Sequence, residues 1–503
     1  MQIKSIELTE IQLPLVHFFE TSFGRTYERR IILVRVEDAD GDEGWGEITC
    51  GESPGYSDEW TDAAWVTTEK ILAPMVVGKE VASAADIWGL MKWARGHRMS
   101  KAGIETACWD LEAKKLGVPL WRHIGGIRNE IECGVSIGIQ DSVEQLFGKI
   151  QTELDAGYRR IKIKIAPGWD YDVIKQVRER FGDIRLMGDA NSAYTLDDID
   201  LFKQMDEFDL MMFEQPLAFD DMLDHSKLQR EIKTPICLDE SVKSPEDARK
   251  AIELKAGRII NVKLGRVGGH AQAQLVEKVA RENNIPIWCG GMLESGIGRA
   301  HNIAMSTLEG FTLPGDVSAS KRYWHEDIIE PAVEVTKRGT IIAPEKPGIG
   351  FEIRRDRIEE LTVRKVTLQT ETTGGKQIID LPKIELDWSD WHPWTSVATH
   401  VRNGGVAIPN GIKGVYEVRR KDTGEYLTIG KASDLRWRVR QGLVTGKAPH
   451  SSGEMIRAAE DFDPANLQVR WAVTDRPSAA EEELHRAHRE ANNGALPKFT
   501  RHT

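Results

Sequence analysis

RIKIK, at residues 160–164, is a short apolar run that ends in a lysine, and it opens a regular series. Four similar runs follow, and each also ends in an ionisable residue: IRLMGD (184–189), LMMFE (210–214), TPICLD (234–239) and RIINVK (258–263). The five final residues, Lys164, Asp189, Glu214, Asp239 and Lys263, are separated by 25, 25, 25 and 24 positions. One strand, one returning helix and two loops take roughly this length in a (β/α) barrel. The spacing therefore predicts such a barrel, with one ionisable side chain at the C-terminal end of each of five consecutive strands.

The C-terminal ends of barrel strands are where such folds carry their chemistry. Asp189, Glu214 and Asp239 would repel one another there unless one took up a proton or a cation lay between them. Mg²⁺ and Mn²⁺ prefer oxygen ligands and leave positions open for a carboxylate substrate. We therefore predict a Mg²⁺ (or Mn²⁺) site on these three carboxylates, flanked by Lys164 and Lys263 as potential bases. The alternative is a set of salt-bridged barrel ends without a metal.

The bulk properties indicate more than one domain and a reducing compartment. A chain of 503 residues is too long for one compact core. The five cysteines form no CxxC pair, and three of them lie in apolar runs, which favours buried, unpaired thiols. The N-terminus is charged and alternates like a strand, and no run approaches the roughly 18 apolar residues of a membrane span. We expect a cytoplasmic protein without a membrane segment.

The composition also changes along the chain. Residues 1–128 mix strands and helices, as in an α+β capping domain, and strand–helix alternation over 129–320 predicts the barrel. Residues 321–368 return to hairpin-like strands that would complete barrel and cap. A polar stretch begins a linker at 369–396. Beyond it, residues 397–503 carry 17 Lys+Arg against 13 Asp+Glu, whereas the whole chain has a net charge of −12, so a small, mildly basic domain is expected.

Residues 1 to about 368 resemble the enolase superfamily, in its muconate-cycloisomerase subgroup. The motifs are KIK (162–164), DAN (189–191), EQP (214–216), LDES (238–241) and NVK (261–263). Further motifs are most similar to the o-succinylbenzoate synthases that also racemise N-succinylamino acids: TSFG (21–24), GWGE (44–47), GVSIGIQ (134–140), GRVGG (265–269) and CGGMLESGIGRA (289–300). The resemblance implies a modified TIM-type barrel with an N-terminal capping domain.

The same resemblance implies a Mg²⁺-dependent lyase or racemase that abstracts a proton alpha to a carboxylate through an enediolate. The activity would be o-succinylbenzoate synthase, a dehydration in the menaquinone pathway, or N-succinylamino acid racemase, or both. Such a proton is weakly acidic, so its removal needs a strong base and stabilisation of the negative oxygens that form. Other enzymes of the subgroup, dipeptide epimerases and cycloisomerases, are the alternative. The epimerases usually carry Asp-x-Asp on the eighth strand, which this sequence lacks.

The implied roles can be placed residue by residue. Lys164 would be the base, and Lys263 would act on the opposite face of a small anionic carboxylate substrate. Glu240 would support the metal ligands, and Arg266 would tune Lys263. Residues expected to contact the substrate are Ser22, Ser136, Lys162, Asn191, Met292 and Glu294. We also expect a homo-oligomer formed through the barrel.

Residues of about 410–500 resemble the GIY-YIG nuclease domain. The motifs are GVYEVRRKDTGEYLTIGKASDLRWRVRQG (414–442), AAEEELHRAHRE (479–490) and ALPKFT (495–500). By position, Tyr416, Arg438 and Glu483 (or Glu482) carry over as site residues. Thr428 stands where the family has a second tyrosine, and Thr500 where it often has asparagine. We therefore expect weak nucleic-acid binding with slow or absent cleavage. The alternative reading of the whole chain is a nucleic-acid-binding or nuclease protein that acts through this module.

Overall fold

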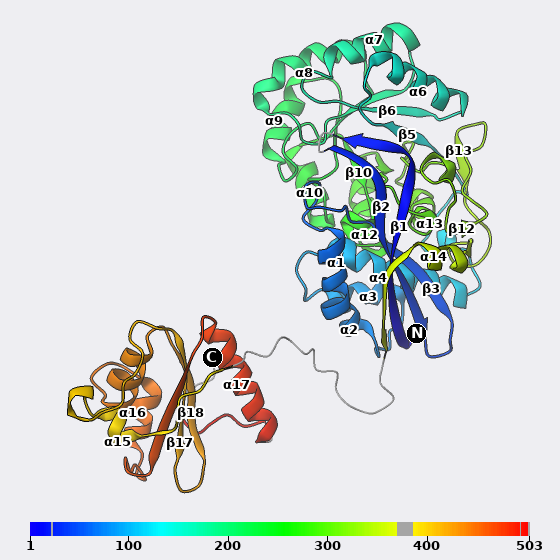
Figure 1. The fold of residues 1–503 in the computed structure, drawn as a ribbon. Helices are drawn as coiled ribbons and strands as arrows, with labels where there is room; N and C mark the ends of the chain where they lie inside the picture. Colours follow the sequence, from blue (N-terminus) through cyan, green and yellow to red (C-terminus); the bar gives the residue numbers. More distant parts are fainter. Residues whose placement is uncertain (22–23, 370–385, 493, 501–503) are drawn as a thin grey trace. The chain divides into compact units, whose positions relative to one another are not determined.

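The computed structural model describes residues 1–21, 24–369, 386–492 and 494–500 (Figure 1). The chain divides into two compact units, Met1–Ile379 and Asp380–Thr503, and each has its own hydrophobic core. Ser22 and residues 370–385 of the predicted linker lie outside the described residues. In the described part of the chain, no helix is long and apolar enough to cross a membrane. The five cysteines are buried and unpaired, as expected.

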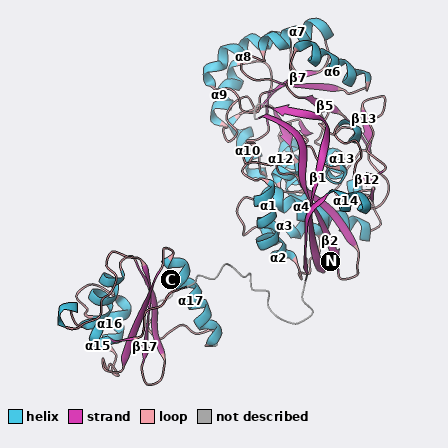
Figure 2. Ribbon diagram, viewed as in Figure 1, coloured by secondary structure: helices cyan, strands magenta, loops and turns pink. Residues whose placement is uncertain are grey.

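The cap of unit 1 contains an antiparallel sheet with the order β15-β1-β2-β3. Its long strands β1 and β2 are labelled in Figure 2. The long helix α4 packs against this sheet, and nearly all of its residues are buried. Gly44 and Gly46 of β3 permit this approach, because a Cβ atom at either position would overlap a carbonyl oxygen of α4. The elements are β1 (Ile3–Thr21), β2 (Gly24–Asp38), β3 (Glu43–Ile48), α1 (Thr61–Thr67), η1 (Thr68–Leu72), α2 (Ala73–Val76), η2 (Ala84–Asp86), α3 (Ile87–Met91), α4 (Arg98–Lys115), α5 (Leu120–His123) and β15 (Thr362–Gln369).

Seven parallel strands follow, hydrogen-bonded in the order β11-β10-β9-β8-β7-β6-β5. They are β5 (Gly134–Ile137), β6 (Arg160–Lys164), β7 (Leu186–Asp189), β8 (Phe213–Glu214), β9 (Ile236–Leu238), β10 (Ile259–Val262) and β11 (Ile287–Cys289). The segment 311–316 lies between the two ends of this sheet, since Phe311 forms a parallel bridge to Ile287 and Gly315 forms one to Cys133. The predicted α/β fold, with a capping domain before a parallel barrel sheet, is therefore confirmed for unit 1.

Helices connect the parallel strands, and several begin where the sequence provides a cap. Ser244, for example, accepts a hydrogen bond from Asp247 N, and Pro245 occupies the first turn of α10. The helices are α6 (Val143–Asp155), α7 (Tyr171–Phe181), η3 (Leu196–Asp198), α8 (Ile199–Met205), η4 (Asp206–Phe208), α9 (Leu223–Glu231), α10 (Pro245–Leu254), α11 (Leu264–Val267), α12 (His270–Glu282), α13 (Gly296–Ser306) and η5 (Ser320–Arg322).

The chain then returns from the barrel to the cap, where β15 pairs with β1. The hairpin-like strands expected around 321–368 are very short, and a helix that the strand pattern did not predict, α14 (Arg355–Leu361), precedes β15. Two small antiparallel pairs complete this part: β4 (Glu130–Glu132) with β13 (Thr340–Ile342), and β12 (Ile329–Glu330) with β14 (Glu352–Ile353).

Unit 2 is a small α+β domain around the sheet β16-β19-β17-β18. Its elements are β16 (His392–Pro393), α15 (Trp394–Ala398), η6 (Val401–Asn403), β17 (Gly414–Arg420), β18 (Tyr426–Ala432), η7 (Arg436–Val444), α16 (Ser451–Ala458), β19 (Leu467–Val473) and α17 (Pro477–Ala491). The prediction that the linker runs to residue 396 was wrong at its C-terminal end. Trp388 bridges to Ala472 and β16 pairs with β19, so residues 388–396 belong to the folded domain.

Candidate active site at the barrel end

Lys164, Asp189, Glu214, Asp239 and Lys263 lie at the C-terminal ends of β6 to β10, and all five are buried. The strand register pairs Lys164 with Asp189 and Asp189 with Glu214. Asp239 directly follows β9, and Lys263 directly follows β10. Since the sheet order is β10-β9-β8-β7-β6, the two lysine strands flank the three carboxylate strands.

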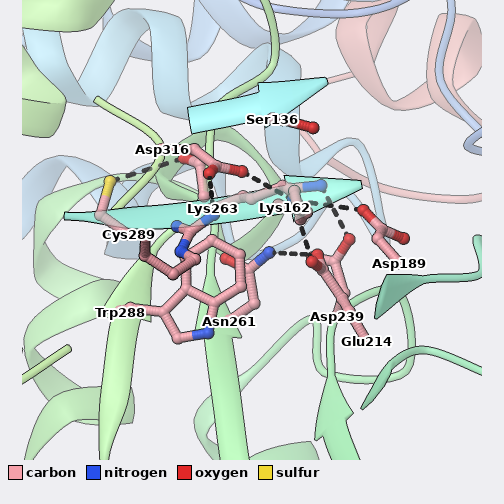
Figure 3. Close-up of polar contacts among 12 residues, drawn as sticks. Ser136, Lys162, Asp189, Glu214, Asp239, Asn261, Lys263, Trp288, Cys289 and Asp316 are labelled. Carbon is pink, nitrogen blue, oxygen red and sulfur yellow. Dashed lines mark hydrogen bonds and ion pairs between the residues drawn. The ribbon is translucent and has the colours of Figure 1, made fainter. Parts of the chain in front are cut away.

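Lys162 lies among three carboxylates (Figure 3). Its Nζ atom is 2.6 Å from Asp316 Oδ2, 2.9 Å from Glu214 Oε2 and 3.2 Å from Asp189 Oδ2. Arg160, two residues earlier on β6, donates from Nη1 to Asp316 Oδ1 at 2.7 Å. Burial disfavours the charged form of Lys162, but the three carboxylates together raise its pKa well above the ordinary value. Lys162 is therefore a fixed positive charge at the barrel axis.

Asp239 is held by a second set of donors. Lys263 Nζ donates to Oδ2 at 2.7 Å, and the Arg266 guanidinium donates to Oδ1. Tyr56, from the loop after β3, donates to Oδ2 at 3.3 Å and accepts a hydrogen bond from Lys263 Nζ at 2.5 Å. Burial alone would raise the pKa of Asp239, but Arg266 and Lys263 hold it below its ordinary value. Burial disfavours a charged Lys263, whereas Asp239 raises its pKa.

Lys164 is the first residue of a hydrogen-bonded chain that ends at Glu240. Its Nζ atom donates to Asp189 Oδ2 and to Asn191 Oδ1, both at 2.6 Å. Asn191 Nδ2 donates in turn to Glu240 Oε1 at 3.1 Å. Asn191 has φ = +42°, a left-handed conformation that asparagine tolerates, and this turn directs its amide toward the lysine. Asn191 and Glu240 thus connect Lys164 to the strand end that carries Asp239.

The donor set fits a hard divalent cation. Burial and the neighbouring charge of Asp189 raise the pKa of Glu214 to about 8, so negative charge is crowded at this point. Two buried acceptor oxygens close by, Glu240 Oε2 and Asn261 Oδ1, have no hydrogen-bond partner within the described residues. Asn261 itself donates from Nδ2 to Glu214 Oε1 at 2.8 Å. Buried oxygen atoms of this kind, beside three carboxylates, are ligands that suit Mg²⁺ or Mn²⁺.

The remaining predicted substrate contacts lie around this centre. Ser136, on β5, is buried, and its Oγ has no partner among the residues that the structure describes. Met292 and Glu294 lie in the loop Gly290–Ser295, after β11. Both Glu294 oxygens are already hydrogen-bonded, to Met292 N and to Asn302 Nδ2, each at 2.9 Å. Glu294 therefore shapes its own loop.

Sequence reasoning missed four residues of the site: Tyr56, Asn261, Trp288 and Asp316. Asp316 ends the apolar run FTLPGD (311–316), so the rule that found the five strand-end residues also fits it. Asn261 is two residues before Lys263 and shares its strand face. The Trp288 ring has Arg160 and Lys162 on it at 4.8 and 4.9 Å. Tyr56 had no local signal, because its partner Lys263 is 207 residues away.

In unit 2, Tyr416 and His450 form a buried pair. Tyr416 Oη lies 2.9 Å from His450 Nε2, and His450 Nδ1 accepts a hydrogen bond from Gly453 N at 3.1 Å. A neutral imidazole with an accepting Nδ1 carries its hydrogen on Nε2, which then donates to the tyrosine. Burial raises the pKa of Tyr416 to about 12, against the effect of Arg438. Burial and Arg438 lower the pKa of His450 to about 4. Tyr416 and Arg438 thus lie together.

The charge of Glu481, on α17, acts on Tyr416. Its carboxylate accepts a hydrogen bond from Lys431 N at 3.1 Å and pairs with Lys431 Nζ at 2.9 Å. Glu483, the residue chosen from the sequence, lies 3.7 Å from Arg486. Glu481 is therefore a further candidate for this cluster beside Glu483.

The two positions that depart from the GIY-YIG pattern contact each other. Thr500 Oγ1 donates to Thr428 Oγ1 at 3.4 Å and accepts a hydrogen bond from Ile429 N at 3.1 Å. Thr428 is buried. The hydroxyl pair thus joins the C-terminal segment to β18, which is a structural role.

Comparison with known proteins places unit 1. Residues 5–125 match the model of the mandelate racemase / muconate lactonizing enzyme N-terminal domain, and residues 147–357 match the model described as enolase C-terminal domain-like. The chain is 50% identical over 362 residues to an o-succinylbenzoate synthase of Geobacillus kaustophilus, which covers 72% of this chain and 96% of the relative. It is 48% identical over 363 residues to an N-succinylamino acid racemase of Thermus thermophilus, covering 72% and 98%.

A solved structure agrees with these matches. A member of the enolase superfamily from Listeria innocua superposes with a TM-score of 0.71 at 38% identity, covering 73% of this chain and 99% of that one. The barrel with its strand-end lysines and carboxylates, the two family models and these relatives lead to one conclusion: the chain belongs to the enolase superfamily.

Proposed function

We propose that this chain is a Mg²⁺-dependent enzyme that removes a proton alpha to a carboxylate, acting as o-succinylbenzoate synthase, as N-succinylamino acid racemase, or as both. The observation that carries the proposal is the arrangement of Lys164 and Lys263 on the strands that flank three buried carboxylates. The names of the Geobacillus and Thermus relatives supply the two candidate substrates.

Asp189, Glu214 and Asp239 would hold the metal ion. When bound, Mg²⁺ would stabilise the negative charge that develops on the substrate carboxylate as the alpha proton leaves. Lys162 is fixed by Asp316 and lies beside two of these ligands, so it can bind the same substrate carboxylate from the β6 side. Ser136 Oγ, which is buried on the neighbouring strand β5, is available as a further donor.

Lys164 would remove the proton, and Asn191 orients its amine through the 2.6 Å hydrogen bond. The strand of Lys263 lies on the opposite side of the three carboxylate strands from that of Lys164. In racemisation Lys263 returns a proton to the opposite face of the substrate. In the dehydration Lys263 would only stabilise charge, and the ammonium formed on Lys164 would give the proton to the departing hydroxyl, which leaves as water. Arg266 and Tyr56 both contact Asp239 and thereby fix the carboxylate beside Lys263.

A dipeptide epimerase is the less favoured alternative. The segment that closes the barrel carries Asp316 and then Ser318, where an Asp-x-Asp pair would be needed. Asp316 is already engaged by Arg160 and Lys162, so it is not free to bind a substrate ammonium group.

The test begins with the metal and both substrates. Chelation should abolish turnover of the substrate of o-succinylbenzoate synthase and of an N-succinylamino acid, and Mg²⁺ or Mn²⁺ should restore it. Assays of both substrates in parallel decide which activity the chain has. Full turnover in a verified metal-free preparation would contradict the metal assignment.

The lysine roles have a separate test. The racemisation rate should fall by about 10²–10⁴-fold in Lys164→Ala and in Lys263→Ala, because each substitution removes one of the two proton-transferring groups. In D₂O, each variant should still exchange the alpha proton of the enantiomer that faces its remaining lysine. Racemisation at the wild-type rate by either variant rules out the two-base arrangement.

For unit 2 we propose a second, weaker function, the binding of nucleic acid through a GIY-YIG-like site. The observation that favours it is the contact of Tyr416 with His450 and Arg438, which come from three separate parts of this domain. Affinity should fall as salt rises, since phosphate contacts release counterions, and Arg438→Ala should weaken binding. Metal-dependent DNA cleavage that is lost in Arg438→Ala would show an active nuclease instead.

A further inference from the structure

Glu47, on β3 of the cap, has its carboxylate at the N-terminus of the barrel helix α13. Its Oε1 atom accepts a hydrogen bond from Ser295 N at 3.1 Å, and Oε2 accepts from Gly298 N at 2.9 Å and from the Ser295 hydroxyl. Ser295 is the N-cap residue and itself accepts from Ile297 N. A carboxylate here satisfies N–H groups that have no partner inside the helix and interacts favourably with the helix dipole.

The segment that this contact fixes is the loop Gly290–Ser295, between β11 and α13. At its start, Gly290 lies against the proposed proton relay, since a Cβ atom there would be 2.7 Å from Lys263 Cε. In its middle, Met292 O accepts a hydrogen bond from Arg29 Nη2 at 3.4 Å, and Met292 Sδ accepts one from Thr49 Oγ1 at 3.7 Å. Within six residues the loop thus runs from Lys263 to the cap.

The cap residues that hold the loop belong to one face of its sheet. Glu47 and Thr49 are two positions apart along the same strand direction, so their side chains point the same way. Glu47 pairs in register with Leu33 on β2, and Arg29 is four residues before Leu33, which gives it the same facing. One face of the sheet therefore contacts the middle of the loop, at Met292, and its end, at Ser295.

The Glu47 contact leaves little room for adjustment. A Cβ atom at Gly298 would be 2.9 Å from both the Glu47 carboxyl carbon and Glu294 Cβ. Burial raises the pKa of Glu47 to about 7, against the Ser295 hydrogen bond, and the nearby charge of Glu294 acts in the same direction as burial. A buried acid beside a like charge depends on its donors, and the donors of Glu47 are Ser295 and Gly298.

Glu105, on α4, makes the same kind of contact at another helix. It accepts hydrogen bonds from His270 N and Ala271 N, both at 2.8 Å, at the N-terminus of α12. It is also fully buried, and burial raises its pKa to about 7. Its donors are α12 and Trp109, whereas the donors of Glu47 lie at the end of the loop 290–295. Glu105 is therefore a matched control for Glu47.

We propose that Glu47 is a positioning residue: it fixes the loop Gly290–Ser295 to the cap so that the loop forms a wall of the substrate pocket beside Lys263. The proposal rests on the proposed function of unit 1, because the pocket is the pocket of that enzyme. In this proposal, hydrogen bonds from a residue of the cap fix the position of a barrel loop.

Glu47→Gln and Glu105→Gln test the proposal, since each removes a charge and keeps the side-chain size. Hydrogen exchange of the full chain is followed by mass spectrometry without substrate, and KM and kcat are measured with whichever substrate the wild type turns over. In Glu47→Gln, amides of residues 291–298 should exchange roughly 3- to 30-fold faster, the effect expected for a weakened helix cap. KM should rise about tenfold with kcat within about threefold. Glu105→Gln should speed exchange only at the start of α12 and leave KM unchanged.

The outcomes separate the two claims. Unchanged exchange in 291–298, or faster exchange with a wild-type KM, would overturn the positioning role. If Glu47→Gln does not fold, Glu47→Asp, which keeps the charge but is too short for all three hydrogen bonds, is measured in the same way. A wild-type chain that turns over neither substrate overturns the proposed function, and the pocket role of Glu47 with it.

Discussion

At the residue scale, Asp316 shows how buried charges in unit 1 share ion-pair partners. It is the carboxylate that Arg160 and Lys162 share, and Lys162 is in turn shared with Asp189 and Glu214. A buried charge that loses its partner is strongly destabilising, because desolvation is no longer compensated. The position of the Lys162 ammonium therefore depends on a residue from the segment that closes the barrel.

The first prediction follows from this sharing. Asp316→Asn should lower the free energy of unfolding of unit 1 by about 3 kcal/mol, since it leaves Arg160 without its carboxylate partner. It should also raise KM, because Lys162 is then drawn toward Glu214 and Asp189. Urea unfolding and steady-state kinetics measure the two effects. In a Lys162→Met background the same change should raise KM no further, and fully additive effects on KM would show that Asp316 does not act through Lys162.

The second prediction concerns His450 and pH. Its pKa in the folded domain is about 4, against an ordinary value near 6.5, so between these values the unfolded state binds more protons. The stability that comes from the neutral imidazole is therefore complete above about pH 6.5 and is lost as pH falls toward 4. Urea unfolding of residues 380–503 at pH 7 and pH 5 should show a steeper loss for the wild type than for His450→Asn. Equal losses in both proteins contradict the assignment.

At the scale of elements, residues 388–393 form a segment, here called the strap, that pairs with β19. The linker therefore ends before residue 388. Ser389 N donates to Trp471 O at 2.9 Å, and β16 pairs with β19. Arg470 lies over the rings of Trp388 and Trp391 at 4.2 and 4.5 Å. The strap thus covers the edge of β19, which would otherwise expose its backbone groups.

The third prediction compares two versions of unit 2. A protein that starts at residue 386 should fold, whereas one that starts at residue 394 loses the strap, together with two cross-strand pairs and three cation–π contacts. At about 0.5–1 kcal/mol for each of these five contacts, the free energy of unfolding should fall by roughly 2.5–5 kcal/mol. Thermal unfolding of both proteins measures the loss. Equal melting temperatures would show that residues 388–393 belong to the linker.

At the scale of the whole molecule, the chain joins two units with separate hydrophobic cores. The enolase-superfamily matches lie entirely within the first unit. Strand β15, which pairs with β1, is the last described element of that unit, so its sheet is complete by residue 369. We therefore predict that the barrel chemistry does not require unit 2.

The fourth prediction tests that independence. A protein that ends at residue 379 should keep its turnover per active site within a few-fold of the full chain, because few core contacts should cross such a boundary. The activity assay and gel filtration of both proteins provide the measurement, and gel filtration also tests the expected homo-oligomer. Loss of both turnover and assembly on truncation would show that unit 2 is a structural part of the enzyme.

The sequence by itself determined the barrel and the superfamily, because the signal is local and repeated. A strand followed by its returning helix has a fairly constant length, so Lys164, Asp189, Glu214, Asp239 and Lys263 could be found from their spacing alone. Parallel strands align their carboxyl ends, and the register of Lys164 with Asp189 and of Asp189 with Glu214 reflects this. Their roles in catalysis stay predictions.

Only the tertiary structure decided which distant residues complete the sites. Tyr56 reaches Lys263 across 207 positions, and Glu47 reaches Ser295 across 248, so no local pattern could pair them. The effect of Glu481 on Tyr416 could not be found from the sequence, since three consecutive glutamates of α17 look alike there. The spacing of residues along the chain predicts structural features that repeat. A single long-range contact depends instead on how whole elements pack against each other.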